Sequence, residues 1–311
     1  MDRGIRASSR FDSNLEKIGL ASIEQLCYNL EHVFFSKDEK VSPMLEEIYS
    51  NDILDPIYLT PITQNPDLAA HRPSLEDVLN QQRALPSFSL LLGLCEDALP
   101  LVLDLTDPGS GAFLIAGDNG FDNTTLMHSL LTAAFKTNRP SEVSLHLISP
   151  HADDLLYFHR QPNFKISYEP YRPEIEIVLE EMVNLVSSRK RSGQITPVHL
   201  FAIDGLDLLW QALGPQAKLR LDWLIEHGPG VGLWVFASIE STYISKSLQS
   251  TIDLFPSRIL GRISQPNLAR YLSGLSRSYL SDLVSGAQYF VRTGGNSFKI
   301  WVLQSEDLSG K

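Results

Sequence analysis

The hydrophobic pattern changes character along the chain. Between residues 12 and 50 apolar positions recur at spacings of mostly three or four, which predicts helices. Residues 51–74 hold four prolines in a polar background and predict an extended connector. Ser74, followed by Glu76 and Asp77, predicts a short helix with a serine N-cap. We therefore expect a helical N-terminal segment at 1–60, a connector at 61–84 and a larger domain at 85–311.

From residue 88 onwards, short apolar runs alternate with segments of helical period. Strands are predicted at 113–116, 143–148, 198–203 and 231–237, and helices at about 124–137, 173–191 and 215–227. This alternation predicts an α/β domain whose mostly parallel sheet carries helices on both faces. The runs 288–292 and 297–303 flank Gly294, Gly295 and Asn296, which predicts a hairpin that closes the domain.

Composition narrows the classes of function. The 311 residues include 37 acidic and 26 basic side chains, a net charge of −11, so contact with DNA would need a local basic patch. The triplet Arg189-Lys190-Arg191 is one candidate, but its place at the end of a helix that begins with glutamates favours a structural role. Two cysteines, no signal peptide and no apolar run long enough to span a membrane predict a cytoplasmic chain.

The segment after the first strand of the larger domain is the main candidate for chemistry. Its strand, loop and helix order is typical of a phosphate-binding loop, whose pattern is G-x-x-x-x-G-K-[ST]. Gly117 and Thr124 occupy the first and last positions of that pattern, whereas Asp122 replaces its second glycine and Asn123 its lysine. The candidate nucleotide-binding residues are Gly117, Asp118, Asn119, Gly120, Phe121, Asp122, Asn123, Thr124 and Thr125.

Both replacements in this loop act against ATP. The Asp122 carboxylate would repel a triphosphate, and Asn123 supplies no positive charge to neutralise it. Each such charge at ~4 Å is worth around 4 kcal/mol at an effective dielectric near 20. The loop therefore predicts no ordinary use of ATP.

A second candidate position follows the strand at 198–203. Asp204 stands at the C-terminal tip of this strand, where α/β folds bind their ligands. In a P-loop ATPase this aspartate holds magnesium and the next residue is a glutamate that activates water, but here the next residue is Gly205. The alternative is that Asp204 only caps the following helix. We expect no metal site, with Thr124 and Asp204 as ligands only if Mg-nucleotide binds.

The order of these pieces resembles the motor domain of the FtsK/SpoIIIE/HerA family of P-loop translocases, over about residues 85–303. Two matched segments depart from the family: Ser149 stands where an aspartate usually precedes the proline, and Ser238-Ile239-Glu240 replaces the Thr-Gln sensor. The matched segments are Leu101-Val102-Leu103-Asp104-Leu105, Leu114-Ile115-Ala116-Gly117, Pro140-Ser141-Glu142-Val143, Ile148-Ser149-Pro150, Ile203-Asp204, the run from Gly230 to Ser238, and Arg258-Ile259-Leu260-Gly261-Arg262.

This resemblance implies a RecA-like fold, with Asp204 at the Walker B position and Ser238 at the sensor position. Active members hydrolyse ATP to move DNA or to drive protein export, and tandem type VII secretion ATPases of the EccC/EssC kind include domains with decayed sites. Because the positions that carry chemistry are lost, the sequence predicts a pseudo-ATPase with a structural, regulatory or partner-binding role in a larger translocation or secretion motor. Such a pseudo-ATPase is expected to bind no cofactor and to have no catalytic residue.

The expected partners are other motor-family domains or subunits, a peptide or a secretion substrate, at the cytoplasmic side of a membrane assembly. The alternative is an active ATP-driven DNA or protein translocase that uses Mg-ATP with an unusual loop, helped by Lys136 or Arg139. Residues 6–15 also resemble 258–268, so the start of the chain is either the tail of a preceding motor domain or a chance similarity. His146 and His199 are expected in the core.

Overall fold

The computed structural model describes residues 73–82, 85–150, 156–275 and 279–304. The chain divides into two compact units, 1–57 and 58–311. The helical segment predicted at 1–60, the repeat of residues 6–15 and most of the predicted connector lie outside the described residues. Everything below concerns the second unit.

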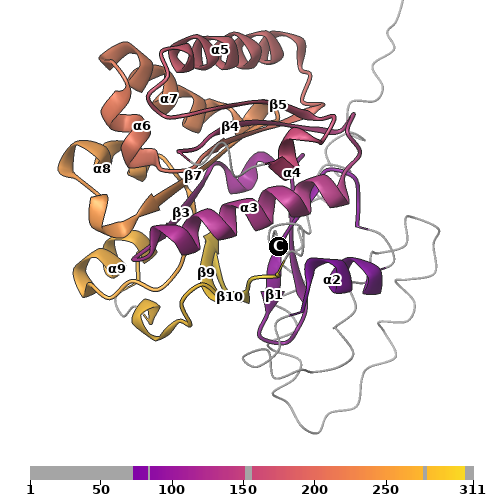
Figure 1. Cartoon of the computed structure of the whole chain (residues 1–311), viewed down its shortest axis with the longest axis vertical. Coiled ribbons are helices and arrows are strands. Elements are labelled where there is room, and N and C mark those ends of the chain that lie inside the picture. The colour runs from indigo at the N-terminus through magenta and orange to yellow at the C-terminus, as the bar shows by residue number, and fades with distance from the viewer. Residues whose placement is uncertain (1–72, 83–84, 151–155, 276–278, 305–311) are drawn as a thin grey trace, which may run out of the picture. The chain divides into compact units, whose positions relative to one another are not determined.

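A ten-stranded sheet forms the centre of this unit, in the order β2-β1-β10-β9-β8-β3-β7-β6-β4-β5 (Figure 1). Strands β8, β3, β7, β6, β4 and β5 run parallel to one another. Their bounds are β3 Phe113–Gly117, β4 Val143–Ile148, β5 Phe164–Tyr168, β6 Val198–Ile203, β7 Leu233–Glu240 and β8 Ser257–Leu260. The predicted α/β class with a mostly parallel sheet is confirmed.

Four antiparallel strands extend the sheet beyond β8. Their bounds are β1 Ser89–Cys95, β2 Pro100–Asp104, β9 Gln288–Thr293 and β10 Asn296–Trp301. The hairpin of β9 and β10 confirms the one predicted near the end of the domain. The sequence analysis did not predict that β10 pairs with β1, because strands about 200 residues apart carry no local signal of their partner.

Helices cover both faces of the sheet, as Figure 1 shows for α3 (Gly120–Thr137) and for α5 (Glu174–Ser192) with α7 (Pro215–His227). On the α3 face, Leu126 and Met127 pack in the same cluster as Leu145 of β4. On the opposite face, α5 and α7 pack with Phe201 of β6. The remaining helices are α2 Leu75–Gln81, α4 Leu156–His159, α6 Leu206–Ala212, α8 Lys246–Asp253 and α9 Pro266–Ser273, with short 3-10 turns at Pro108–Ser110, Pro229–Val231, Ser241–Tyr243 and Leu280–Asp282.

Two predicted boundaries are wrong. The strand predicted at 231–237 is Leu233–Glu240, because Pro229–Val231 forms a 3-10 turn that ends at Gly232 with a φ of 73°. The helix predicted from about residue 124 begins four residues earlier, at Gly120. Other boundaries agree with the prediction, including β4, β6, α7 and the Ser74 cap, whose hydroxyl accepts a hydrogen bond from Asp77.

The first and last residues of the described domain are linked by backbone hydrogen bonding. The Leu75 amide donates to the Gln304 carbonyl at 2.7 Å, beside a parallel bridge between Ser74 and Gln304. Leu75 and Val78 of α2 are buried in the core, so the chain enters and leaves the described fold at one place. Among the described residues, no helix has the length and apolar character that crossing a membrane requires.

Candidate functional site

The candidate site lies where β3, β7 and β6 end, because these strands are parallel neighbours in the sheet. Gly117 closes β3, Asp204 follows β6, and Ser238 lies near the end of β7. Thr124 comes to the same place from the first turns of α3, since its hydroxyl donates to Asp204 Oδ1 at 2.9 Å. The structure therefore brings together four of the residues that the sequence singled out.

The loop after β3 is too short to form an open phosphate cradle. Only Asp118 and Asn119 separate Gly117 from the start of α3 at Gly120. In the P-loop pattern the whole G-x-x-x-x-G run lies between strand and helix, so that its backbone N–H groups point at phosphate. Here Gly120, Phe121, Asp122 and Asn123 are helical, and the Asn123 amide donates to the Asn119 carbonyl at 3.3 Å.

Asn123 stands where the lysine of the pattern belongs, and it points inward. Its side chain is 1% exposed, and Nδ2 donates to the Ile239 carbonyl at 2.9 Å and to the Gly117 carbonyl at 3.4 Å. These two carbonyl acceptors fix the orientation of the amide, because only its nitrogen can donate to them. The side chain thus fastens α3 to the ends of β3 and β7 and fills the space from which a lysine would reach out.

The two loop aspartates are occupied by neighbouring segments. Asp118 Oδ1 accepts from the Ser241 hydroxyl and Oδ2 from the Ser264 amide, both at 2.6 Å. Burial opposes ionisation of Asp118, but the hydrogen bonds from Ser241 and Ser264, with the nearby Arg262 charge, outweigh it and lower its pKa. Asp122 Oδ2 accepts from the Ser285 hydroxyl at 2.6 Å. These carboxylates are therefore built into the fold.

Asp204 is the centre of a buried hydrogen-bond cluster. Its side chain is 2% exposed. Besides Thr124, the Ser238 hydroxyl donates to Oδ1 at 2.7 Å and the Ser149 hydroxyl donates to Oδ2 at 3.1 Å. The alternative that Asp204 caps α6 is wrong, because the N-cap of that helix is Gly205. Hydroxyl donors from β7, from α3 and from the residue that follows β4 satisfy the carboxylate, which joins these segments.

The position after Asp204 does not suit a glutamate. Gly205 has a φ of 87°, in the left-handed region that disfavours residues with a Cβ atom. A Cβ atom there would also lie 3.2 Å from a methyl group of Leu208. The next carboxylate along the chain is Asp207, which is buried. Burial raises the pKa of Asp207, and repulsion from Glu240 and Asp204 adds to this effect.

Several features of the site act against Mg-nucleotide. Asn123 occupies the lysine position from within the core, its backbone N–H is bonded to the Asn119 carbonyl at the start of α3, and Glu240 places a carboxylate oxygen 3.1 Å from where a Cβ atom of Gly120 would lie. Lys136 is paired with Glu76 of α2 at the far end of α3 and so does not replace the missing lysine. In the described part of the chain, no three histidine, cysteine or acidic side chains group as a metal site.

The sequence analysis missed several members of the site. Ser241, Ser264, Ser285 and Tyr289 contact the loop from segments that are 123 or more residues away along the chain. Isolated serines carry no pattern that would have revealed them. Ser149 did carry a signal, because the family usually has an aspartate there, and its hydroxyl now binds Asp204.

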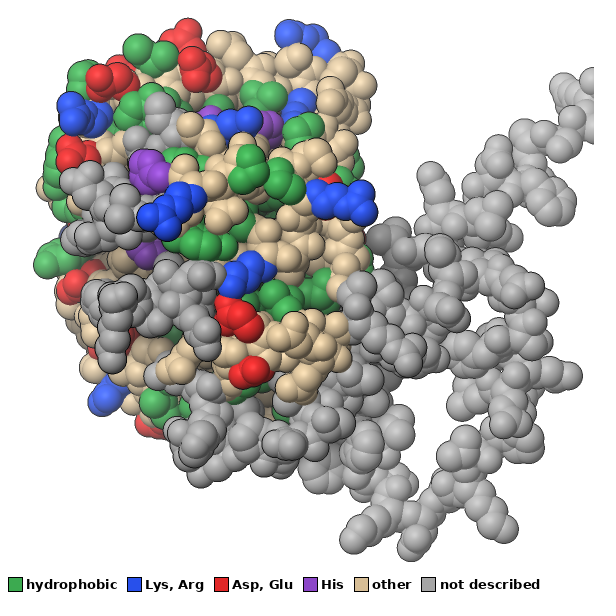
Figure 2. All heavy atoms as spheres, turned by 45° about the vertical axis from the view of Figure 1, so that its right-hand side comes forward, with side chains coloured by type: hydrophobic (Ala, Val, Ile, Leu, Met, Phe, Trp, Pro, Cys, Tyr) green, Lys and Arg blue, Asp and Glu red, His purple; other side chains and the backbone are tan. Residues whose placement is uncertain are grey.

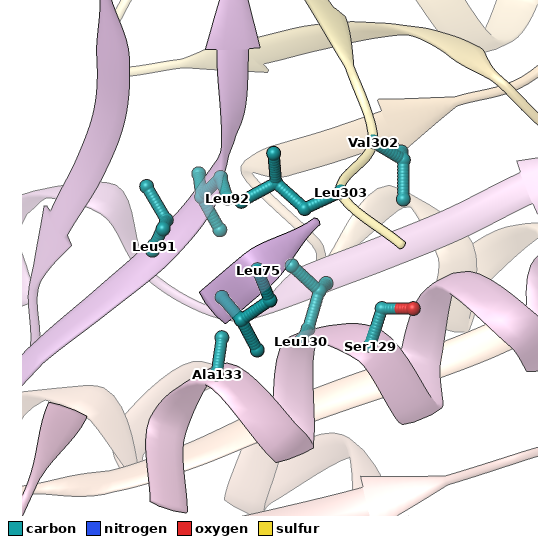
Figure 3. A pocket seen from close by; sticks show the side chains of 8 residues that line it. All are labelled: Leu75, Leu91, Leu92, Ser129, Leu130, Ala133, Val302 and Leu303. Carbon is teal, nitrogen blue, oxygen red and sulfur yellow. The ribbon is translucent and has the colours of Figure 1, made fainter. Parts of the chain in front are cut away.

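Two other features fall outside the site. A hollow of about 10 Å³ between α2, β1, α3 and residues 302–303 is lined by aliphatic side chains and Ser129 (Figure 3). The first residue of the basic triplet on α5, Arg189, has a structural role. It is buried and donates hydrogen bonds to the carbonyls of Val231 and Gly232 at 2.9 and 3.3 Å. On the face in Figure 2, basic and acidic side chains are interspersed, which gives no continuous positive surface for DNA.

The histidines expected in the core are half-buried on β4 and β6, with ring centroids 6.1 Å apart. Ser144 Oγ lies 2.6 Å from His199 Nδ1. Burial lowers the pKa of both histidines to about 4, and the Lys165 charge adds to this effect. The pair is therefore neutral at physiological pH and part of the packing of the sheet.

Solved structures with the same fold include domains of secretion and conjugation ATPases. EssC (ATPases 2 and 3) from Geobacillus thermodenitrificans has a TM-score of 0.61 and 18% identity, over 76% of this chain and 45% of that one. Thermomonospora curvata EccC (ATPases 2 and 3), in complex with a signal sequence peptide, has 0.58 and 15%, over 84% and 46%. The conjugation coupling protein TcpA of pCW3, solved with ATPγS, has 0.54 and 14%, over 70% and 66%.

These matches show that the chain has a P-loop ATPase-like fold. The chain spans about half the length of the EssC and EccC structures it resembles. No protein-family model matches the sequence, and no curated protein does. At 14 to 18% identity the likeness concerns the fold, and what this domain does has to be argued from its own residues.

Proposed function

We propose that this domain is a pseudo-ATPase of the FtsK-like motor type, which serves a larger secretion or translocation assembly as a structural or partner-binding part. The observation that carries the proposal is the position of Asn123. It replaces the lysine, is 1% exposed, and donates its side-chain hydrogen bonds to the main chain of β3 and β7. A residue bound in this way cannot neutralise a phosphate.

The surrounding site supports the same proposal. Three hydroxyls donate hydrogen bonds to Asp204, two of them from serines at positions where the family has other residues. A buried carboxylate needs such donors, because burying an unsatisfied charge is costly. The side chains of the site therefore stabilise the fold. This favours a domain whose function lies in the surfaces that it presents to partners.

The proposed partners and setting rest on analogy with these structures. The EccC and EssC structures hold more than one ATPase domain in a chain, and one of them binds a signal sequence peptide. By analogy, this domain contacts neighbouring motor domains or a peptide, at the cytoplasmic side of a membrane secretion machine.

An active translocase is the second candidate. The observation that favours it is the contact of Thr124 Oγ1 with Asp204 Oδ1 at 2.9 Å, which keeps the two potential magnesium ligands together. The buried side chain of Asn123 and the early start of α3 weigh against it.

The test is a calorimetric titration of the chain with ATP, with and without magnesium, alongside a turnover assay. We expect no saturable heat and no turnover above that of a reaction without the protein. Turnover at or above about 1 per second, the low end of ordinary enzymes, would overturn the proposal.

A further inference from the structure

A small hollow beside the loop presents hydrogen-bond acceptors that phosphate could not use. It has a volume of about 10 Å³, room for one water-sized group. Its lining comes from the start of α3, the end of β8 and the segment before β9, and includes Asp118, Asp122, Asn123 and Arg262. The space exists because Gly117, Gly261 and Gly286 lack side chains there.

The glycine positions show how closely the walls approach. A Cβ atom on Gly117 would lie 2.9 Å from Asn123 Oδ1, and one on Gly286 would lie 2.9 Å from Asp122 Oδ1. One on Gly261 would lie 3.0 Å from the ring of Tyr289. Two acceptor oxygens, one from an amide and one from a carboxylate, therefore point toward the glycine-walled space.

Asn123 Oδ1 is the acceptor that most needs a partner. The residue is 99% buried, its nitrogen is committed to the Ile239 and Gly117 carbonyls, and Oδ1 receives no hydrogen bond. A buried acceptor without a donor costs about 1–3 kcal/mol. What enters this hollow must bring N–H or O–H groups.

The charge around the hollow selects a cation. Arg262 and the positive end of α3 oppose one, but the carboxylates of Asp118, Asp122 and Glu240 all lie about that helix end. The three carboxylates together carry more negative charge than the positive charge of Arg262 and of the helix end, which is equivalent to about half a unit charge. Both oxygens of Asp118 already hold donors, so Asp122 and Asn123 supply the acceptors for a ligand.

We propose that this hollow binds a primary ammonium group, the end of a lysine side chain from a partner polypeptide. The proposal rests on the proposed function, since it turns the former phosphate site into a docking point. An ammonium head is water-sized and carries three donors, whereas a guanidinium is larger than the hollow. A metal cation would need about six oxygen ligands, more than the carboxylates here can supply.

The experiment titrates isotope-labelled protein with methylammonium chloride, as a probe for the lysine head, and follows backbone amides by NMR. Saturable shifts are expected at Gly117, Gly261 and Gly286 and at the Asn123 side-chain amide. Tetramethylammonium at equal ionic strength, which has no N–H donor, should leave them unmoved. Equal shifts with both cations would show a salt effect and overturn the proposal.

Variants and competing ligands complete the test. Asp122→Asn should weaken methylammonium binding at least tenfold, while Glu181→Gln, an exposed acid on α5, should leave it unchanged. Potassium binding as strong as methylammonium would overturn the assignment to an amine. If Mg-ATP moves the same resonances, the pseudo-ATPase proposal fails; if neither ligand binds, only the ammonium site fails.

Discussion

The Thr124 hydroxyl donates to Asp204 Oδ1 at 2.9 Å, so two residues that could share a magnesium ion are bonded directly to each other. Ser238 donates to the same oxygen at 2.7 Å, and its own oxygen accepts from the Gly205 amide at 3.0 Å. The chain of contacts runs from α3 through β6 to β7. Asp204 therefore stabilises the fold whether or not a nucleotide binds, which separates its structural role from any chemistry.

Replacing Asp204 tests this separation. Asp204→Asn should lower the free energy of unfolding by roughly 2–4 kcal/mol in the absence of magnesium, because hydrogen bonds to a charged acceptor are lost in a buried site. Urea unfolding measures this change. Ser238→Ala removes one donor and should cost less. If the Asp204 carboxylate served only to bind a metal, Asp204→Asn would leave the free energy of unfolding unchanged or raise it. This outcome would contradict the structural role.

Restoring the lysine should fail. Asn123→Lys places an ammonium group in a site that is 1% exposed and should destabilise the chain by several kcal/mol, of order 3, because a buried charge lacks a partner. Asn184→Lys, at an exposed position of α5, is the control and should change stability by less than about 0.5 kcal/mol.

The double variant Asp122→Gly with Asn123→Lys brings back the residues of the P-loop pattern. It would gain Mg-ATP affinity only if the cradle itself were intact, and α3 begins at Gly120. We expect its melting temperature to stay unchanged at millimolar Mg-ATP. A rise in a correctly folded double variant would show, by mass action, that the loop can open to bind nucleotide.

Restoring the glutamate after Asp204 should also be costly. Gly205→Glu forces a residue with a Cβ atom into a φ of 87°, which costs about 1–2 kcal/mol. Gly230→Glu has open space and a φ outside the left-handed region, so it separates the backbone effect from added charge. Denaturant unfolding of both variants measures the difference between their free energies of unfolding. Equal stabilities would contradict the strain at Gly205, and ATP turnover by Gly205→Glu would contradict the pseudo-ATPase proposal.

Stability should fall in mild acid because of His146 and His199. Burial lowers the pKa of each to about 4 in the folded chain, from an ordinary 6.5, so the unfolded state binds protons first. Stability is full above pH 6.5 and is lost as the pH falls toward 4. At pH 5 the loss should be roughly 1–2 kcal/mol per histidine.

Urea unfolding at pH 7 and pH 5 measures this dependence. The double variant His146→Gln with His199→Gln should lose most of the slope between the two pH values. His159→Gln, at an exposed position of α4, is the control and should keep it. A slope unchanged in the double variant would assign the acid sensitivity to other groups.

The sequence by itself determined the class of fold and which residues stand at the positions of the P-loop pattern. Alternating apolar runs and helical periods need only local spacing, so β4, β6 and α7 were predicted with their observed bounds. The absence of a lysine at 123 and of a glutamate at 205 is likewise a property of single positions. No tertiary information was needed for either.

Only the tertiary structure decided which contacts these residues make. Asn123 bonds to a carbonyl 116 residues away, and Asp204 gathers donors from three elements, which no local pattern encodes. The early start of α3 has the same cause: contacts of Asp118 and Asp122 with Ser241, Ser264 and Ser285 hold the loop closed. These long-range hydrogen bonds form only once the sheet is assembled, which is why the sequence alone did not reveal them.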